Sequence, residues 1–200
     1  MSSYAAQKYT KLVIKARYLQ SLATDPRIRP ISHEQADGYY HAALAAYVAA
    51  WEAYLEQLVS DFYFSISKPS SPHFQSLYVI AKDCADGALA KFNTPNFENS
   101  RALLTQFTGY DPYSDWIWPR RSMGVFQVNT RLTEILKVRH SFAHGFSMPP
   151  YSWNSQLRGK CRLTRKSMAM VDVFFQNLVA RTDRGMQLHI LHVYGIAVVW

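Results

Sequence analysis

Apolar residues recur at helical spacing along most of the chain. Residues 4 to 23 fit a helix with one basic face, and the segment 25–30, which contains prolines, interrupts it. Ser32 with Gln35 three residues later forms a capping-box pattern, which predicts that a second helix begins at about residue 33. Large apolar residues then follow at alternating spacings of four and three: Leu44, Val48, Trp51, Leu55, Leu58 and Phe62. We expect this long helix to lie at the centre of a helical bundle.

The middle and the end of the chain contain further helical patterns. Apolar residues predict a helix over 74–89, and Thr94 followed by Pro95 offers the N-cap and first position of a short helix that ends near Phe107. Residues 149–166 mix aromatic and basic side chains and are interpreted as a loop, after which 167–181 fit another helix. The β-branched tail from Leu188 fits a strand and a docked helix equally. The indicated fold class is all-α.

A helix that ends at Gly145 combines an apolar stripe with unusual polar residues. Ser122 is its expected N-cap, and its apolar residues fall at 125, 128, 132, 135, 136, 142 and 143. At about 100° per residue, Arg139 lies near the middle of that stripe. Because a buried arginine keeps its charge, this position requires a carboxylate, a phosphate or a wet cleft. His140 and His144 lie together at the edge of the same face, in the turn where a helix C-terminus favours positive charge.

Composition sets the broad class of the protein. Two hundred residues with 48% hydrophobic content are enough for one sizeable core. The net charge of +8 favours a polyanionic partner, although basic surfaces also serve solubility. Cys84 and Cys161 have no metal or redox spacing, so we expect a reduced, cytoplasmic protein. The N-terminus does not resemble a signal peptide, and no apolar stretch reaches the length of a membrane span, so no membrane partner is expected.

The pair Arg139 and His144 forms an Arg-x4-His motif, which is a weak signal by itself. Roughly half of one match is expected by chance in a chain with this number of arginines and histidines. The chain contains two, the second being Arg184 with His189. That second match crosses Gly185 into the β-branched tail, where no periodic helix is evident, and we interpret it as coincidental. The first gains weight from its place on an apolar stripe directly before a glycine.

The stretch from Leu132 to Gly145 resembles the signature helix of HEPN domains, whose Arg-x4-6-His motif often ends in Ala-His-Gly. Two other stretches, 51–56 and 92–99, resemble the RiboL-PSP type of that family. The resemblance implies an all-helical bundle, often dimeric, and many members are metal-independent endoribonucleases of toxin or antiviral systems. It therefore implies one HEPN-like domain over 1–200, with a family-like core at about 33–181 and a docked tail at 182–200. His140 stands where asparagine or aspartate often follows the arginine.

The residue chemistry agrees with that resemblance. RNA is cut without a metal ion or another cofactor if a base deprotonates the ribose 2′-OH, which attacks the adjacent phosphorus and leaves a cyclic phosphate. His144 is the candidate acid or base, and Arg139 is the candidate phosphate ligand. Because residues five apart point about 140° away from each other on a helix, we expect a symmetric dimer with a composite site at its interface. An antitoxin or regulatory protein is a further expected partner.

Several residues are expected to support RNA cleavage. His140 and Glu52 are the candidate helpers, Glu52 because it lies at the edge of the long helix's apolar stripe and can orient Arg139. Basic residues expected to contact RNA flank the motif on both sides along the chain: Arg120, Arg121, Arg158, Lys160 and Arg162.

Other interpretations of the same residues stay open at this point. Arg139 can instead pair with a core carboxylate such as Glu52, with both histidines serving only to cap the helix end. The i, i+4 histidines can be a metal pair, but no further ligand motif supports one, and no metal site is expected. A non-catalytic HEPN module that binds RNA, a nucleotide or a protein is the runner-up to a ribonuclease, and a purely structural helical dimer is a third interpretation.

Overall fold

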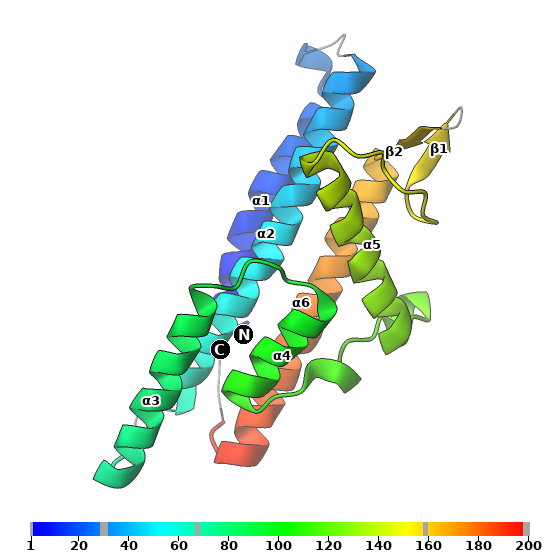
Figure 1. Ribbon diagram of the computed structural model, residues 1–200. Helices are drawn as coiled ribbons and strands as arrows, with labels where there is room; N and C mark the ends of the chain where they lie inside the picture. The colour runs from blue at the N-terminus through cyan, green and yellow to red at the C-terminus, as the bar shows by residue number, and fades with distance from the viewer. Residues whose placement is uncertain (1, 29–31, 67–68, 158–159, 198–200) are drawn as a thin grey trace.

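Helices make up nearly all of the regular structure in this computed structural model, which describes residues 2–28, 32–66, 69–157 and 160–197. Within these ranges the α-helices are α1 (Tyr4–Leu22), α2 (His33–Ile66), α3 (Pro72–Leu89), α4 (Phe97–Thr108), α5 (Val125–Ala143) and α6 (Arg165–Tyr194) (Figure 1). Short 3-10 turns follow at η1 (Pro26–Ile28), η2 (Pro112–Ser114) and η3 (Pro119–Arg121). Strands β1 (Ser155–Leu157) and β2 (Lys160–Arg162) form a small antiparallel hairpin. The predicted all-α fold class is confirmed.

The long helix α2 lies at the centre of the bundle, as its apolar pattern predicts. It packs against α1 and α6 along its length, while α4 and α5 contact it from another side (Figure 1). Trp51 is fully buried near its middle, and its ring contacts those of Tyr54, Trp116 and Phe175. Buried aromatic rings of this size supply a large share of the hydrophobic stabilisation of a core. The alternating spacing of four and three therefore marked a helix that is buried on several sides.

The ends of the first two helices are held by side-chain caps. The predicted capping box is present, since Ser32 N–H donates to the Gln35 side chain at 2.8 Å and Gln35 N–H donates to Ser32 Oγ at 3.1 Å. At the start of α1, Ser3 Oγ accepts from Ala6 N–H and donates to Asp183 of α6. The first pair of bonds closes the start of α2 locally, and the Ser3 bond to Asp183 ties the start of α1 to α6.

Two predicted helix caps were wrong. Helix α4 begins at Phe97, because Asn96 rather than Thr94 is the cap and accepts from Asn99 N–H at 2.7 Å. Helix α5 begins at Val125 with Gly124 as its N-cap. Ser122 instead ends η3 with a φ of 50°, in a turn closed by paired hydrogen bonds between Trp118 and Met123. The Thr94 hydroxyl donates to the Asn93 side chain at 3.1 Å instead of capping the helix, and Ser122 is held in the turn before α5.

The chain after residue 149 is more ordered than predicted. The segment interpreted as a loop contains the β1–β2 hairpin, whose three-residue strands are too short to give a recognisable period. Helix α6 begins at Arg165 and continues to Tyr194, so residues 188–194 are helical and not a strand.

Gly185 lies inside α6 and does not interrupt it. A Cβ at this position would come within 1.9 Å of the Tyr110 hydroxyl and 2.4 Å of Asp115 Oδ2, so the glycine allows a close contact between α6 and the α4–η2 segment. The interpretation that no helix underlies Arg184 and His189 was therefore wrong. His189 Nε2 donates to the Thr108 carbonyl at 2.9 Å, which satisfies the C-terminal end of α4.

Candidate functional site

Helix α5 positions the Arg139 motif by burying one side against the core. Val128, Leu132 and Ile135 are buried with at most 1% of their surface exposed, and they follow the predicted apolar stripe. In the last turn the buried face shifts to Val138 and Ser141. The C-terminal turn of α5 is thereby anchored to the bundle through residues on either side of the motif arginine.

Arg139 itself is exposed, which corrects the expectation that it is buried on the apolar stripe. The stripe turns away from it because Val138 and Ser141 carry the burial in the last turn. Within the described residues Arg139 makes neither a hydrogen bond nor an ion pair at 4.0 Å or less, so the core ion pair of the alternative interpretation is not formed. The guanidinium is charged at any physiological pH and available to an anion.

A groove of about 800 Å³ lies along this side of α5. Its walls come from three places: α5 with Asn129, Thr133, Lys137, Arg139 and His140; the start of α4 from Thr94 to Glu98; and the segment after the helix with Phe146, Ser147, Pro149 and Tyr151. Arg139, His140 and Lys137 place basic or titratable groups on it, and Phe146 and Tyr151 add aromatic rings. The sequence interpretation missed Lys137 and Phe146, because the groove is formed only when the segment after α5 folds back along the helix; Tyr151 belongs to the aromatic, basic segment in which RNA contacts were expected.

The two histidines meet at the end of α5. The ring centroids of His140 and His144 are 4.2 Å apart, and the Phe146 ring stacks on that of His144 at 5.9 Å. His144 is the helix cap, with its N–H donating to the His140 carbonyl at 3.1 Å. Gly145 adopts a φ of 68°, and Phe146 N–H then donates to the Ser141 carbonyl at 2.8 Å. This left-handed turn, which favours glycine, brings Phe146 over the histidines.

His144 stands slightly apart from the groove. Arg139 and His140 are among the residues that line it. His144 is not, but its ring contacts those of His140 and Phe146, which do line the groove. The motif therefore presents an arginine and one histidine to the groove, with the second histidine at its edge. All three side chains are solvent-exposed.

Glu52 lies near the motif without contacting Arg139 directly. It is half-buried on α2, and burial raises the pKa of its carboxyl above the usual range, with a further increase from Glu56. The charge of Arg139 opposes this increase without reversing it, so the pKa of Glu52 stays raised. The two groups thus interact electrostatically, at a separation beyond that of an ion pair.

The three predicted RNA-contacting residues whose side chains the structure describes do not line this groove. Arg120 and Arg121 are exposed in η3, and Arg162 is half-exposed in β2, and none of these three lines it. Lys160 belongs to β2, where only its backbone is described, and Arg158 lies outside the described residues. Arg121 lines a different cleft, with its guanidinium 5.8 Å from the centre of the Trp118 ring.

His41 is a further residue that the sequence interpretation missed. It is buried on α2, and its ring stacks on Phe142 of the motif turn with centroids 4.1 Å apart. Its Nε2 lies 3.6 Å from Asp37 Oδ2, and its Nδ1 is buried without a hydrogen-bond partner. The i, i+4 pair of Asp37 and His41 was the sequence signal available, but nothing in it indicates a contact with α5.

Metal binding and membrane crossing also bear on the class of site. Among the residues that the structure describes, no three His, Cys, Asp or Glu side chains are grouped so as to hold a metal ion. Within the same ranges, none of the helices combines the length and the apolar character needed to cross a membrane.

The fold and the groove together define an all-helical bundle whose fifth helix ends in an exposed Arg-x4-His motif. The family model described as RiboL-PSP-HEPN matches residues 11–179, and the chain belongs to this family. Neither the curated proteins nor the solved structures contain a significant match. Proteins with HEPN domains are often ribonucleases, and they often bind RNA and dimerise.

Proposed function

We propose that this protein is a metal-independent endoribonuclease, with Arg139 and His144 as its catalytic residues. The observation that carries the proposal is the unpaired, exposed guanidinium of Arg139 at a groove beside the adjoining rings of His140 and His144. An unpaired arginine binds phosphate through two parallel hydrogen bonds, and imidazoles exchange protons near neutral pH. Family membership supports the same assignment.

The proposed reaction is transesterification within the RNA strand. One imidazole takes the proton of a ribose 2′-OH, and the 2′-oxygen bonds to the adjacent phosphorus. The bond from phosphorus to the 5′-oxygen of the next nucleotide breaks, and that oxygen takes a proton from a second acid. The products are a 2′,3′-cyclic phosphate end and a 5′-hydroxyl end. Arg139 stabilises the negative charge that develops on the phosphate.

The second acid has two sources in this proposal. His140 lies beside His144, with 4.2 Å between ring centroids, and supports it within one protomer. A second protomer supplies another Arg139 and His144 if the two α5 helices meet across a two-fold axis. Exposed apolar side chains near the motif favour such a contact, since Phe142 is 53% and Phe146 64% exposed. Light scattering should then give twice the chain mass of 23.0 kDa.

Glu52 is a positioning residue in this proposal. Its half-buried carboxyl acts on the Arg139 guanidinium through space and favours an orientation of that side chain over the groove. The roles of Arg120, Arg158, Lys160 and Arg162 in RNA contact stay predictions. A cytoplasmic toxin or antiviral setting, with an antitoxin or regulatory protein as partner, is part of the same proposal, because an RNA-cleaving activity requires control.

A non-catalytic RNA-binding module is the second candidate, and one observation favours it. His144 does not line the groove, whereas Arg139 and His140 do. The reaction needs both a base and an acid, so a groove with His140 as its one imidazole binds RNA without cleaving it if His144 does not reach the substrate.

RNA cleavage in EDTA by the wild type and by His144→Ala separates the two candidates. His192→Ala is the matched control, because His192 is also an exposed helical histidine but lies in the last turn of α6. Circular dichroism and light scattering check the fold and mass of each protein. Cyclic-phosphate ends that are lost in His144→Ala and kept in His192→Ala support the ribonuclease. Salt-dependent RNA binding with no cleavage of any RNA supports the binding module instead.

A further inference from the structure

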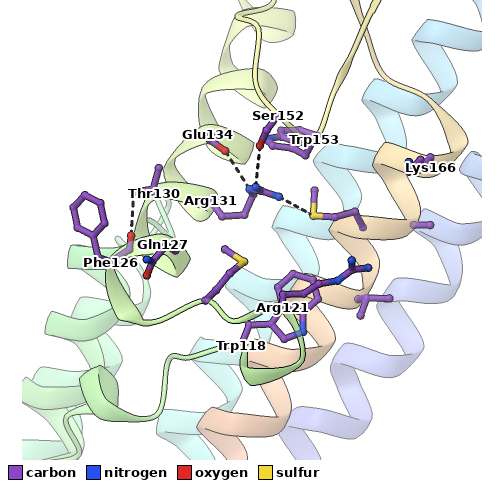
Figure 2. A pocket seen from close by; sticks show the side chains of 14 residues that line it. Trp118, Arg121, Phe126, Gln127, Thr130, Arg131, Glu134, Ser152, Trp153 and Lys166 are labelled. Atoms are coloured by element: carbon purple, nitrogen blue, oxygen red, sulfur yellow. Dashed lines mark hydrogen bonds and ion pairs between the residues drawn. The ribbon is translucent and has the colours of Figure 1, made fainter.

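A second cleft of about 720 Å³ lies on a neighbouring side of α5, and the proposed reaction does not use it (Figure 2). It is enclosed by the Trp118–Met123 turn, by the α5 residues from Phe126 to Glu134, by Ser152 and Trp153, and by the first turns of α6. Four separate segments of the chain converge on it. This cleft is called the tryptophan cleft below.

The walls of the tryptophan cleft are largely apolar. Trp118 and Trp153 are 3% and 8% exposed and form part of its inner wall. Towards the solvent, Phe126 is 79% and Val173 48% exposed, so apolar surface is left in contact with water. A flat apolar group that enters the cleft removes that surface from water, which favours binding.

The same cleft carries a net positive charge. Arg131 is held in place by Glu134 Oε2 at 3.1 Å, Ser152 Oγ at 3.3 Å and Met170 Sδ at 3.3 Å (Figure 2). Glu134 therefore balances one cation. Arg121 and Lys166 are exposed on the cleft and form no ion pair within the described part of the chain. Apolar walls with two uncompensated cations suit a ligand that joins a flat ring to an anion, as a nucleotide does.

The tryptophan cleft adjoins the groove that contains Arg139. Neighbouring residues of α5 line the two: Asn129 and Thr133 face the groove, while Thr130 and Glu134 face the cleft. The loop before β1 is shared in the same way, since Tyr151 lines the groove and its ring lies parallel to that of Trp153, with 6.4 Å between centroids. A strand bound in the groove can therefore continue into the cleft across two adjoining faces of α5.

We infer that the tryptophan cleft binds one unpaired nucleotide of the RNA strand whose scissile phosphate lies at Arg139. The base enters the apolar part of the cleft, and a flanking phosphate lies at Arg121 and Lys166. A base within a duplex is stacked and paired and cannot enter, so the substrate class is single-stranded RNA. This inference rests on the RNA-directed function proposed above.

The decisive variant is Ala169→Trp, which fills the cleft without removing a charge. Ala169 is exposed on the second turn of α6 and lines the cleft. Ala81→Trp is the matched control, since Ala81 is also an exposed helical alanine but lies on α3, away from both sites. The probe is a fluorescent 2′-O-methyl RNA oligonucleotide, which cannot be cleaved, titrated in EDTA by anisotropy. An otherwise identical oligonucleotide with abasic positions serves as the second probe.

The expected result is at least a tenfold loss of affinity for the base-containing strand in Ala169→Trp, with Ala81→Trp unchanged. For the abasic strand, Ala169→Trp and the wild type should bind equally. The double variant Arg121→Ala, Lys166→Ala leaves the cleft open and should reduce the slope of log K against log salt by about 1.4, as expected for two lost phosphate contacts on a single strand. It keeps the test valid if Ala169→Trp does not fold.

If folded Ala169→Trp binds the base-containing strand as tightly as the wild type does, the inference is overturned, whether or not the protein cleaves RNA. The cleft could instead bind a free mononucleotide, which offers the same base and phosphate. Titration with AMP and UMP, monitored by tryptophan fluorescence, tests for that ligand. If Ala169→Trp abolishes mononucleotide binding but leaves the affinity for the strand intact, the cleft binds a free nucleotide. That result also overturns the inference. If Ala169→Trp weakens strand binding and the wild type cleaves no RNA, the nucleotide-binding role of the cleft is supported. Only the ribonuclease proposal is then overturned.

Discussion

His41 of α2 stacks on Phe142 of α5, with ring centroids 4.1 Å apart and ring planes within 6° of parallel. Phe142 lies between the two motif histidines in sequence, so this contact joins the central helix to the turn that carries them. His41 is 5% exposed and its Nδ1 makes no hydrogen bond, which indicates that the ring serves chiefly by packing.

Replacing His41 by Ala should destabilise the fold by about 2–3 kcal/mol, because it leaves a cavity and removes a ring contact. His41→Phe keeps a ring of similar shape and should stay within about 1 kcal/mol of the wild type. Urea unfolding measures both. Equal losses in the two variants would show that the contact with Asp37, rather than the ring stack, holds this position.

Arg139→Ala should reduce kcat/KM for RNA by about 100-fold or more, since the developing phosphate charge loses its main partner. Arg139→Lys keeps the charge but not the planar pair of donors, and should recover only part of that loss. Arg184→Ala is the matched control, because Arg184 is exposed in the second Arg-x4-His match, whose His189 binds the Thr108 carbonyl. A comparable loss in Arg184→Ala would contradict the assignment of the site to α5.

Gly185→Ala should destabilise the protein by about 1–3 kcal/mol, because its Cβ would lie 1.9 Å from the Tyr110 hydroxyl. Gly87→Ala on α3 is the comparison, since nothing lies within 4 Å of the added Cβ there. It should stabilise the helix by about 0.5–1 kcal/mol. Thermal unfolding of both variants checks the contrast. If Gly185→Ala is as stable as the wild type, α6 and the α4–η2 segment can move apart without a loss of stability.

Acid titration should reveal the half-buried carboxyl of Asp183 on α6, which holds the start of α1. Burial raises the pKa of Asp183 above its usual value of 3.8, although its bonds to Ser3 oppose the shift. The folded state then holds a proton that the unfolded state has released, so this group lowers the free energy of unfolding as pH rises from about 4 through the folded-state pKa. Asp183→Asn should remove that decrease from a plot of Tm against pH.

Asp111→Asn should change the pH dependence of the free energy of unfolding in the opposite direction from Asp183→Asn. The Arg101 guanidinium holds the pKa of Asp111 below 3.8, so this group contributes stability above pH 4 and loses it as pH falls through the lowered pKa. The pair is exposed, so the change should be small. If both variants change the pH dependence of stability in the same direction, one of the two pKa shifts has the wrong direction.

Local chemistry in the sequence was enough to determine the fold class and the motif. The alternating apolar spacing of α2 and the Ser32–Gln35 capping box depend on residues close together in the chain, and both were predicted as the structure has them. The position of Arg139 and His144 at the end of a helix follows from the same local pattern and from Gly145.

Only the tertiary structure decided which of those residues are buried and which share a surface. Arg139 falls on the apolar stripe by angle, yet it is exposed because the bundle contacts Val138 and Ser141 in the last turn. Helix α6 continues through Gly185 into the tail, and Gly185 fits closely against Tyr110, a residue 75 positions earlier in the chain. The tryptophan cleft joins four distant segments. Burial and cleft formation depend on contacts between residues far apart in sequence, and helical periodicity carries no information about them.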